Sequence, residues 1–436
     1  MSITKDHYAE SFGFPYREDG GVTSAEGFAA AGVHAGFRAN PNKFDLALVV
    51  ADEPAAAAGM FTQNVFCAAP VQVSRAHLQA TGGSAADGLP VHGTARAVVI
   101  NSGNANAATG DIGNQHAEEM ANITAEAVGC PTDEVLVAST GVIGVHLPMD
   151  PFETGVPIAQ EQLSAAAAGG HDAALAIMTT DTVPKECAVT FEGDDIGCPG
   201  ATFTVGGMAK GSGMIMPNMA TMISVITTDA PLAPSALAHA LKKAVDASFN
   251  KVTVDSDTST NDTCILLASG AAAPHAQPFE LESEAYATFE KALLQVCTTL
   301  ARAMAQDGEG ATRLITVTVK GAATDEDADL AARAIANSPL VKTAVFGHDA
   351  NWGRIAAAAG RSGAAFAQEN VSITMMGMPV CKDGLTLIFD EEEALRRFEA
   401  PEIPIVVDLG AGNAHTTVWT CDLTHDYVTI NGDYRT

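Results

Sequence analysis

The sequence predicts a mixed α/β fold, and three observations indicate it. Runs of apolar and β-branched residues recur along the 436 residues, segments with a helical spacing of apolar residues lie between them, and turn-rich stretches interrupt both. Strands and helices do not alternate strictly, which disfavours a parallel barrel or a dinucleotide-binding fold. The length is sufficient for one large domain or for two domains of ordinary size.

Eight runs have the composition of strands, and five segments have the periodicity of helices. The predicted strands are 45–52, 96–103, 134–140, 219–229, 264–270, 313–321, 402–410 and 415–423. The predicted helices are 114–129, 157–169, 234–248, 285–306 and 327–337. The helix of 234–248 begins with Pro234 and Ser235, which are residue types typical of helix starts. Segments 81–95 and 271–280 are rich in turn residues and are expected to be loops.

The composition excludes several classes of function. Hydrophobic residues make up 47% and charged residues 17% of the sequence, a balance typical of a folded globular protein. The net charge of −29 disfavours binding to nucleic acid or to an anionic membrane surface. No apolar run approaches the roughly 20 residues that cross a bilayer, and the N-terminal residues lack the pattern of a signal peptide. We therefore expect a cytoplasmic enzyme.

Metal sites and disulfide bonds are not expected from the sequence. The eight Cys residues are scattered and form no CxxC pair, and the twelve His residues form no HxH or HxxxH pair. Reduced, buried thiols are the better interpretation of the cysteines. We predict no metal and no other cofactor.

The segment KGSGMIMPNMATMISVITTDA, residues 210–230, contains a candidate nucleophile, Thr221. A hydroxyl needs an adjacent base, and a threonine at a chain N-terminus has one in its own α-amine, whose pKa is about 8. An internal threonine can reach that state by attacking the carbonyl before it, here that of Ala220, to form an ester that water cleaves. Thr221 is also compatible with an ordinary β-branched residue of a buried strand. This segment alone leaves both interpretations open.

Three other segments carry candidate polar groups. STGVIG (139–144) ends a predicted strand, where Thr140 and Gly141 offer a hydroxyl and a backbone N–H that can stabilise an oxyanion by about 3 kcal/mol per donor. Glu309, between two glycines, can hold an ammonium group, and MTTDTVPK (178–185) is a hydroxyl-rich turn that can line a pocket. The alternatives are a plain strand-to-turn junction, a solvated turn acid and capping residues.

Ten motifs follow one another over nearly the whole chain. They are GGVTSAEGFAAAGVHAGFR (20–38), MFTQNVFCAAPVQVSR (60–75), VVINSGNANAATG (98–110), STGVIG (139–144), IMTTDTVPK (177–185), GGMAKGSGMIMPNMATM (206–222), TVDSDTSTNDT (253–263), DGEGATRLITV (307–317), KTAVFGHDANWGRI (342–355) and CDLTHDYVTINGDYRT (421–436). In this order they resemble the ornithine acetyltransferase (glutamate N-acetyltransferase) family of arginine biosynthesis. The resemblance implies a self-processing N-terminal-threonine acyltransferase fold, similar to the layered sandwich of the aminopeptidases. VDSDTSTND and GHDANWGRI depart slightly from the family pattern, beside the proposed catalytic positions rather than on them.

The resemblance also implies that the chain is a precursor that cleaves itself between Ala220 and Thr221. Residues 1–220 would form an N-terminal α fragment, and residues 221–436 would form a C-terminal β fragment that begins with the nucleophile. Because the fragments of this family stay associated, we expect a heterotetramer of two α and two β fragments.

Further site residues follow from the resemblance position by position. Thr140 and Gly141 match the oxyanion hole of the family. The positions that match its substrate-binding residues are Lys210, Thr221, Glu309, Asn431, the C-terminal Thr436 and one of Thr179 and Thr180. Thr180 is favoured, although the threonine doublet leaves the alignment open.

The implied reaction moves an acetyl group from N-acetylornithine to glutamate through an acetyl-Thr221 ester. This exchange requires no acetyl-CoA, and the sequence leaves open whether acetyl-CoA is a second donor. The alternative enzyme is an N-terminal-threonine aminopeptidase or amidase, for which water is the acceptor. The alternative from another class is a non-catalytic binding protein with the same fold.

Overall fold

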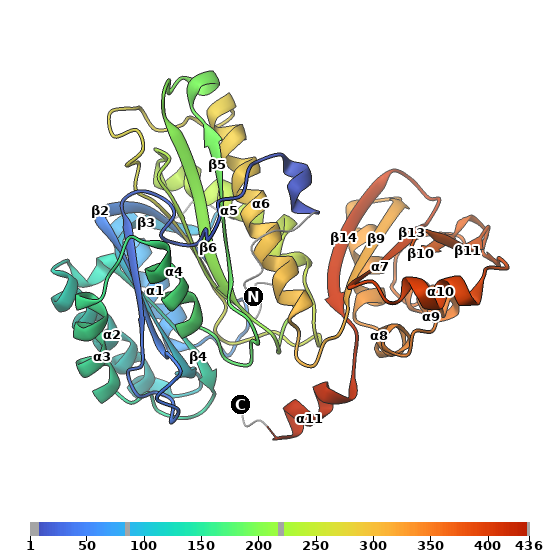
Figure 1. Ribbon diagram of the computed structural model, residues 1–436, viewed down its shortest axis with the longest axis horizontal. Helices are drawn as coiled ribbons and strands as arrows, with labels where there is room; N and C mark the ends of the chain where they lie inside the picture. The colour runs from blue at the N-terminus through green and yellow to red at the C-terminus, as the bar shows by residue number, and fades with distance from the viewer. Residues whose placement is uncertain (1–7, 83–87, 217–221, 434–436) are drawn as a thin grey trace.

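The computed structural model describes residues 8–82, 88–216 and 222–433, and it has two sheets, each with its own helices. Strands between residues 28 and 268 form the first sheet, and strands between residues 314 and 421 form the second. Figure 1 shows the second sheet and its helices at one end of the molecule, beside α6 (Glu284–Gln306). The mixed α/β fold predicted from the sequence is confirmed.

The first sheet has the strand order β4-β3-β2-β8-β7-β6-β5, and β1 pairs with β2 off this path. Neighbouring strands are antiparallel except for the parallel pairs β3–β4 and β7–β8. Strand β2 bends the sheet, because its register shifts between Val50 and Ala55 and its partner changes from β1 to β8. The strands are β1 (Phe28–Val33), β2 (Leu46–Phe61), β3 (Val91–Asn104), β4 (Val135–Val142), β5 (Lys185–Glu192), β6 (Thr202–Lys210), β7 (Ile223–Thr228) and β8 (Thr263–Ala268).

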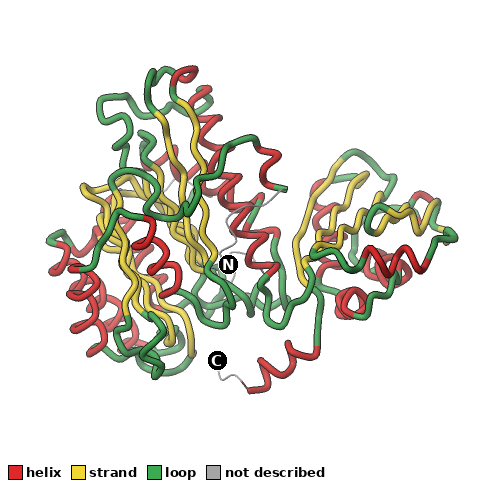
Figure 2. The backbone as a smooth tube through the Cα atoms, in the orientation of Figure 1, coloured by secondary structure: helices red, strands yellow, loops and turns green. Residues whose placement is uncertain are grey.

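Helices cover both faces of this sheet, as Figure 2 shows. The helices are α1 (Ala69–Gly82), α2 (Gly110–Val128), α3 (Asp150–Glu161), α4 (Ala167–Ala176), α5 (Pro234–Ala247) and α6. Helices α5 and α6 share one core with β5 to β8, whereas α4 packs with the opposite face, so that in β7 Ile226 lies in one core and Val225 in the other. A strand buried on both faces has no place for charged side chains. This burial accounts for the absence of charge along 222–228.

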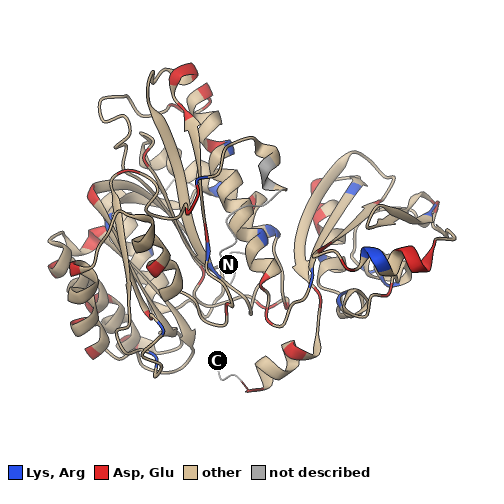
Figure 3. Cartoon of the chain, in the orientation of Figure 1, with Lys and Arg blue, Asp and Glu red and all other residues tan. Residues whose placement is uncertain are grey.

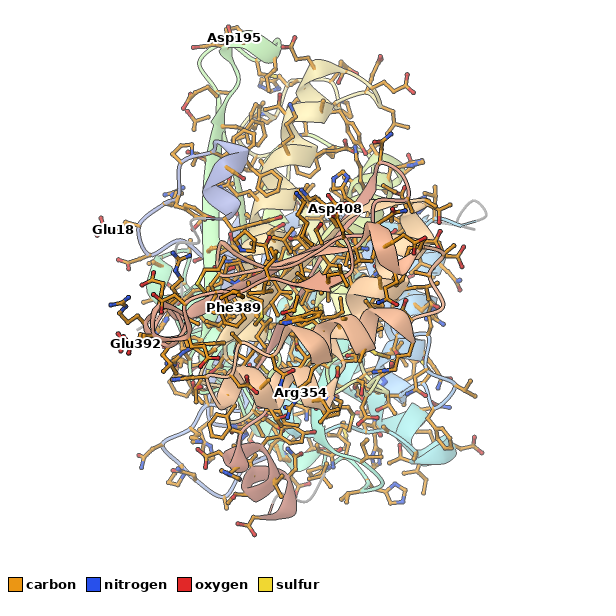
Figure 4. All side chains as sticks on the ribbon, turned by 90° about the vertical axis from the view of Figure 1, so that its right-hand side faces the viewer. Glu18, Asp195, Arg354, Phe389, Glu392 and Asp408 are labelled. Atoms are coloured by element: carbon orange, nitrogen blue, oxygen red, sulfur yellow. The ribbon has the colours of Figure 1, made fainter. Side chains whose placement is uncertain are left out.

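The second sheet has the order β12-β11-β10-β13-β9-β14 and its own hydrophobic core. Its strands are β9 (Leu314–Ala322), β10 (Ser372–Met375), β11 (Met378–Lys382), β12 (Leu385–Thr386), β13 (Glu402–Asp408) and β14 (Ala414–Cys421). Its helices are α7 (Asp325–Ala336), α8 (Pro339–Phe346), α9 (Trp352–Gly360) and α10 (Glu391–Arg397), and α11 (His425–Asp433) follows β14. In Figure 4, which is viewed from this end, the labelled Phe389, Glu392 and Asp408 belong to this unit, whereas Asp195 lies at the far end of the first.

Acidic residues occur in both units, mainly on helices and turns, as Figure 3 shows, and the basic residues are fewer. Both units therefore contribute to the charge of −29. No helix of the described residues combines the length and the apolar character that crossing a bilayer requires.

The eight predicted strands are all found, and the start of the strand predicted at 219–229 lies outside the described residues. The end predicted at residue 52 is wrong, because β2 continues to Phe61. The single helix predicted at 157–169 is wrong. Helix α3 ends at Glu161 and α4 begins at Ala167, because Ser164 between them forms a β-bridge with Ala30 through two backbone hydrogen bonds of 3.0 Å. The apolar spacing continues through this turn, so the sequence pattern does not reveal it.

The cleavage point predicted from the resemblance, between Ala220 and Thr221, lies outside the described residues. The strands on either side of it, β6 and β7, are antiparallel neighbours in the first sheet, and Lys210 pairs with Ile223. Fragments 1–220 and 221–436 would therefore both contribute strands to one sheet. The division into these fragments stays a prediction.

Candidate active site

One cleft brings together all the predicted site residues that the structure describes. They come from the end of β4, the loop before β5, the end of β6, the loop after α6, and α11. Within one cleft they are Thr140, Gly141, Thr179, Thr180, Lys210, Glu309 and Asn431. The other predicted positions, Ala220, Thr221 and Thr436, lie outside the described residues.

Thr140 and Gly141 are held at the end of β4 by close backbone packing. Gly141 has φ +136°, and a Cβ atom there would lie 2.3 Å from the carbonyl carbon of Gly103 on β3, so only glycine fits. The Asn261 side chain donates to the carbonyl of Ser139, at 2.9 Å, and so anchors the residue before Thr140. A fixed hydroxyl and an adjacent backbone N–H are the components of an oxyanion hole.

Lys210 is the one cationic residue among the described residues that line the cleft. Its side chain is 3% exposed, and its Nζ lies 3.9 Å from Asp181 Oδ2. Burial is the largest influence on Lys210 and lowers the pKa of its ammonium, and Asp181 partly offsets that effect. A buried ammonium on the wall of a cleft is suited to bind a carboxylate.

Glu309 is buried and not a solvated turn acid, since it is only 8% exposed. Its carboxylate accepts a hydrogen bond of 2.7 Å from Asn431 Nδ2 of α11. The neighbouring glycine Gly310 has φ +70°, and a Cβ atom there would lie 2.6 Å from the backbone nitrogen of Tyr427. The structure shows that at Gly310 the neighbour is α11.

The two threonines before β5 both line the cleft, so their positions do not distinguish them. The backbone N–H of Thr179 donates to Asp181 Oδ2 at 3.0 Å. The preference for Thr180 as the substrate-binding residue therefore stays a prediction.

Several residues of the cleft were not singled out in the sequence. Asp255 accepts hydrogen bonds from the backbone N–H groups of Met214, at 2.6 Å, and Ile215, at 2.8 Å, and from the Tyr427 hydroxyl, at 3.3 Å. Burial raises the pKa of Asp255, and burial together with Asp255 and Glu309 raises the pKa of Tyr427. Asp257, which is exposed, also lines the cleft. The sequence did carry a signal for these residues, because the motif at 253–263 contains three acids, Asp255, Asp257 and Asp262.

The backbone just beyond the predicted nucleophile is also fixed. Asp262, fully buried at the start of β8, accepts a hydrogen bond of 2.9 Å from the Met222 N–H through Oδ1. Burial raises the pKa of this carboxyl well above its usual range. The N–H of Thr263 donates to the carbonyl of Met222 at 2.9 Å. Met222 is thus held from both sides at the head of β7.

The fold and the cleft define a class of protein: an α/β protein whose cleft is lined by one buried ammonium, three carboxylates, and the adjacent residues Thr140 and Gly141. Such a cleft suits a small zwitterionic or amino-acid ligand. Among the described residues no group of three or more His, Cys, Asp and Glu side chains is arranged to hold a metal ion.

The chain belongs to the ArgJ family, whose profile matches residues 29–436. It is 50% identical over 419 residues to the arginine biosynthesis bifunctional protein ArgJ of Symbiobacterium thermophilum, covering 96% of this chain and 99% of that protein. It is 47% identical over 411 residues to the protein of the same name from Chlorobaculum tepidum, covering 94% and 96%. The family resemblance inferred from the sequence is confirmed.

Two solved structures are also similar in sequence. The crystal structure of arginine biosynthesis bifunctional protein ArgJ from Bacillus halodurans has 44% identity and a TM-score of 0.47, covering 48% of this chain and 98% of that chain. Ornithine acetyltransferase of Mycobacterium tuberculosis, complexed with ornithine, has 38% identity and a TM-score of 0.41, covering 48% and 99%.

Proposed function

We propose that this chain is an acetyltransferase of arginine biosynthesis that moves an acetyl group from N-acetylornithine to glutamate, with Thr221 as the nucleophile. The observation that carries the proposal is the convergence of seven predicted site residues, spread from Thr140 to Asn431, on one cleft. Family membership and the names of the relatives support it.

In the first half-reaction, Thr221 Oγ attacks the acetyl carbonyl carbon and its proton passes to the Thr221 α-amine. The Thr140 hydroxyl and the Gly141 N–H donate hydrogen bonds to the oxyanion that forms. The C–N bond then breaks, and ornithine leaves with the proton on its amino group. In the second half-reaction the glutamate α-amine attacks the ester, the C–O bond breaks, and the Thr221 hydroxyl is restored.

The charges of the cleft suit the ends of the donor. Lys210 would bind the α-carboxylate, which N-acetylornithine and glutamate share. Glu309, Asp255 and Asp257 also line the cleft, and their carboxylates would attract the side-chain ammonium of ornithine. Asn431, which donates to Glu309, would hold that carboxylate in place.

The Thr221 hydroxyl would also cleave the peptide bond before it, so that Thr221 becomes an N-terminal residue. Thr221 Oγ would attack the carbonyl carbon of Ala220, the peptide C–N bond would break, and water would hydrolyse the resulting ester. The products would be the fragments 1–220 and 221–436, which we propose to assemble as two α and two β fragments. Thr436, which lies outside the described residues, matches a substrate-binding position of the family, and we propose that role for it.

The proposal is tested by incubating the protein with N-acetylornithine, with and without glutamate, and following N-acetylglutamate. The fragment that begins at Thr221 should gain the mass of one acetyl group in the donor-only reaction, and the Thr221→Ala variant should be uncleaved and inactive. Release of acetate at the same rate without glutamate would indicate the aminopeptidase or amidase alternative. Acetyl-CoA as the only donor tests the second activity, which the relatives' name, bifunctional, suggests. A Thr221→Ala protein that still splits at this bond would refute the mechanism.

A further inference from the structure

Behind Lys210 lies a buried group of charges that the proposed reaction does not use. Asp181, whose side chain is buried, lies 3.9 Å from Lys210 Nζ through Oδ2. Its Oδ1 accepts hydrogen bonds of 2.7 Å from Lys185 Nζ and from the N–H of Gly211, and its Oδ2 accepts one of 3.0 Å from the N–H of Thr179. Asp181 therefore links the cation of the cleft to the backbone of two cleft segments.

Lys185 is shared between two carboxylates. Its Nζ lies 2.7 Å from Asp181 Oδ1 and 2.6 Å from Asp307 Oδ2. Asp307 also accepts hydrogen bonds from the N–H, at 3.0 Å, and the hydroxyl of Thr182. Among the described residues, Asp181 and Asp307 lie at nearly the same distance from Lys185 Nζ, but only Asp181 is within ion-pair distance of Lys210.

The charges that face Lys210 act in opposite directions. Burial lowers the pKa of the ammonium most, and the like charges of Lys185 and Arg38 lower it further. Asp181 and Glu309 raise it. Asp262, at the start of β8, also interacts with Lys210, but its own raised pKa keeps it a weak source of negative charge. Asp181 is thus the main group that favours the charged form of Lys210.

Asp181 can play this part because it stays ionised. Burial by itself raises its pKa, but Lys185 and Lys210 and the hydrogen bonds that it accepts outweigh burial and hold the pKa of Asp181 far below its usual range. Its oxygens already accept three strong hydrogen bonds, and Lys210 lies at 3.9 Å, outside hydrogen-bond range. The ammonium therefore keeps its N–H donors for a ligand.

We propose that Asp181 is a positioning residue, which keeps Lys210 charged and its donors directed to the cleft so that Lys210 binds the carboxylate of the substrate. The identity of that carboxylate rests on the proposed function. The electrostatic role of Asp181 does not, because it follows from the contacts of the buried group.

The test compares Asp181→Asn with Asp307→Asn, which disturbs Lys185 in the same way without a contact to Lys210. KM and kcat for N-acetylornithine are measured from about pH 7 to about pH 9.5, a range in which the ligand's side-chain ammonium, like that of lysine, stays charged. We expect KM to rise about tenfold for each pH unit above the pKa of Lys210, and this rise should begin at a lower pH in Asp181→Asn than in the wild type. Asp307→Asn should keep the wild-type profile. The pH dependence of kcat, which reports the Thr221 amine, should not move.

A second pair of variants separates charge from structure. In Asp181→Asn combined with Lys210→Arg the guanidinium stays protonated, so the rise of KM with pH should disappear. Asp181→Ser replaces Asp181→Asn if the latter does not fold. A KM profile of Asp181→Asn that coincides with that of the wild type, or an equal shift in Asp307→Asn, would overturn the inference.

A measurement made without substrate tests the role of Asp181 independently of the proposed function. The neutral form of Lys210 reacts with formaldehyde and a borohydride, and peptide mass spectrometry reports the extent of methylation at each pH. We expect the onset of labelling at Lys210 to shift to lower pH in Asp181→Asn and to stay unchanged in Asp307→Asn. If the wild type does not use N-acetylornithine, the proposed function fails, and this shift still decides the role of Asp181.

Discussion

Replacing Thr140 by Val tests the oxyanion hole with little disturbance of the fold. Valine keeps the β-branch that suits strand β4 and has a similar size. Thr140 is 7% exposed, and its hydroxyl makes no hydrogen bond to the described residues, so the folded state loses no internal partner. The free energy of unfolding should therefore change by less than about 1 kcal/mol. The rate should fall by roughly 10²–10³, since one oxyanion donor contributes about 3 kcal/mol to the transition state.

The neighbouring hydroxyl of Ser139 provides the matched control. Ser139 Oγ donates to Asn101 Oδ1 at 2.6 Å, and both residues are buried away from the cleft lining. Ser139→Ala leaves Asn101 Oδ1 without this donor and should cost about 1–3 kcal/mol of unfolding free energy. Its effect on the rate should be much smaller than that of Thr140→Val. Thr140→Val should thus lower the rate and hardly change the stability, whereas Ser139→Ala should lower the stability and hardly change the rate.

The assay is a rapid-quench measurement of acetylation of the fragment that begins at Thr221, with urea unfolding of the same samples. The first half-reaction isolates acyl transfer from product release. A normal acetylation rate in Thr140→Val, or an equal loss of rate in Ser139→Ala, would refute the assignment of Thr140 as an oxyanion donor. Such results would leave the N–H of Gly141 as the only donor assigned.

Two further predictions follow from charge. Asp257→Asn removes one carboxylate from the cleft, so KM for N-acetylornithine should rise about two- to fivefold and KM for glutamate should fall. Asp195→Asn is the control, because Asp195 lies at the exposed β5–β6 turn (Figure 4) and does not line the cleft. Parallel changes in both KM values would contradict the reasoning. Asp229 is buried, and burial, opposed by hydrogen bonds from the N–H groups of Thr204 and Glu26, raises its pKa from 3.8 to about 6. Because the folded state then binds the proton more tightly than the unfolded state, the stability that this group contributes is fully present below pH 3.8 and is lost as pH rises through about 6, by at most about 3 kcal/mol. Urea unfolding at several pH values should show that loss in the wild type relative to Asp229→Asn, and parallel pH curves for the two proteins would exclude it.

The sequence predicted best those elements whose burial is the same along their whole length. Strands β7 and β8 are buried on both faces, so they contain no charged residue and are easily recognised. The separation of α3 from α4 depends instead on the bridge between Ser164 and Ala30, two residues far apart in the sequence. A periodicity pattern contains no information on that contact.

The site shows the same division between local and long-range information. Thr140, Lys210 and Glu309 stand in motifs that can be recognised one at a time, and the structure places them in one cleft. The buried charges behind them cannot be recognised in this way, because the contact of Lys185 with Asp307 joins residues 122 positions apart. In the sequence, Lys185 is only the last residue of a polar turn.

Different groups of the cleft would contact the part that the two proposed substrates share, the α-carboxylate, and the part in which they differ, the side chain. The α-carboxylate is common to N-acetylornithine and glutamate, so a change that neutralises Lys210, directly or through Asp181, should weaken both half-reactions together. The side chains have opposite charges, so a change among Glu309, Asp255 and Asp257 should favour one half-reaction at the expense of the other. One cleft can thus serve a basic donor and an acidic acceptor only if the contact of Lys210 with the shared α-carboxylate dominates binding. Lys210 suits that contact, because its ammonium is buried and Asp181 keeps it charged.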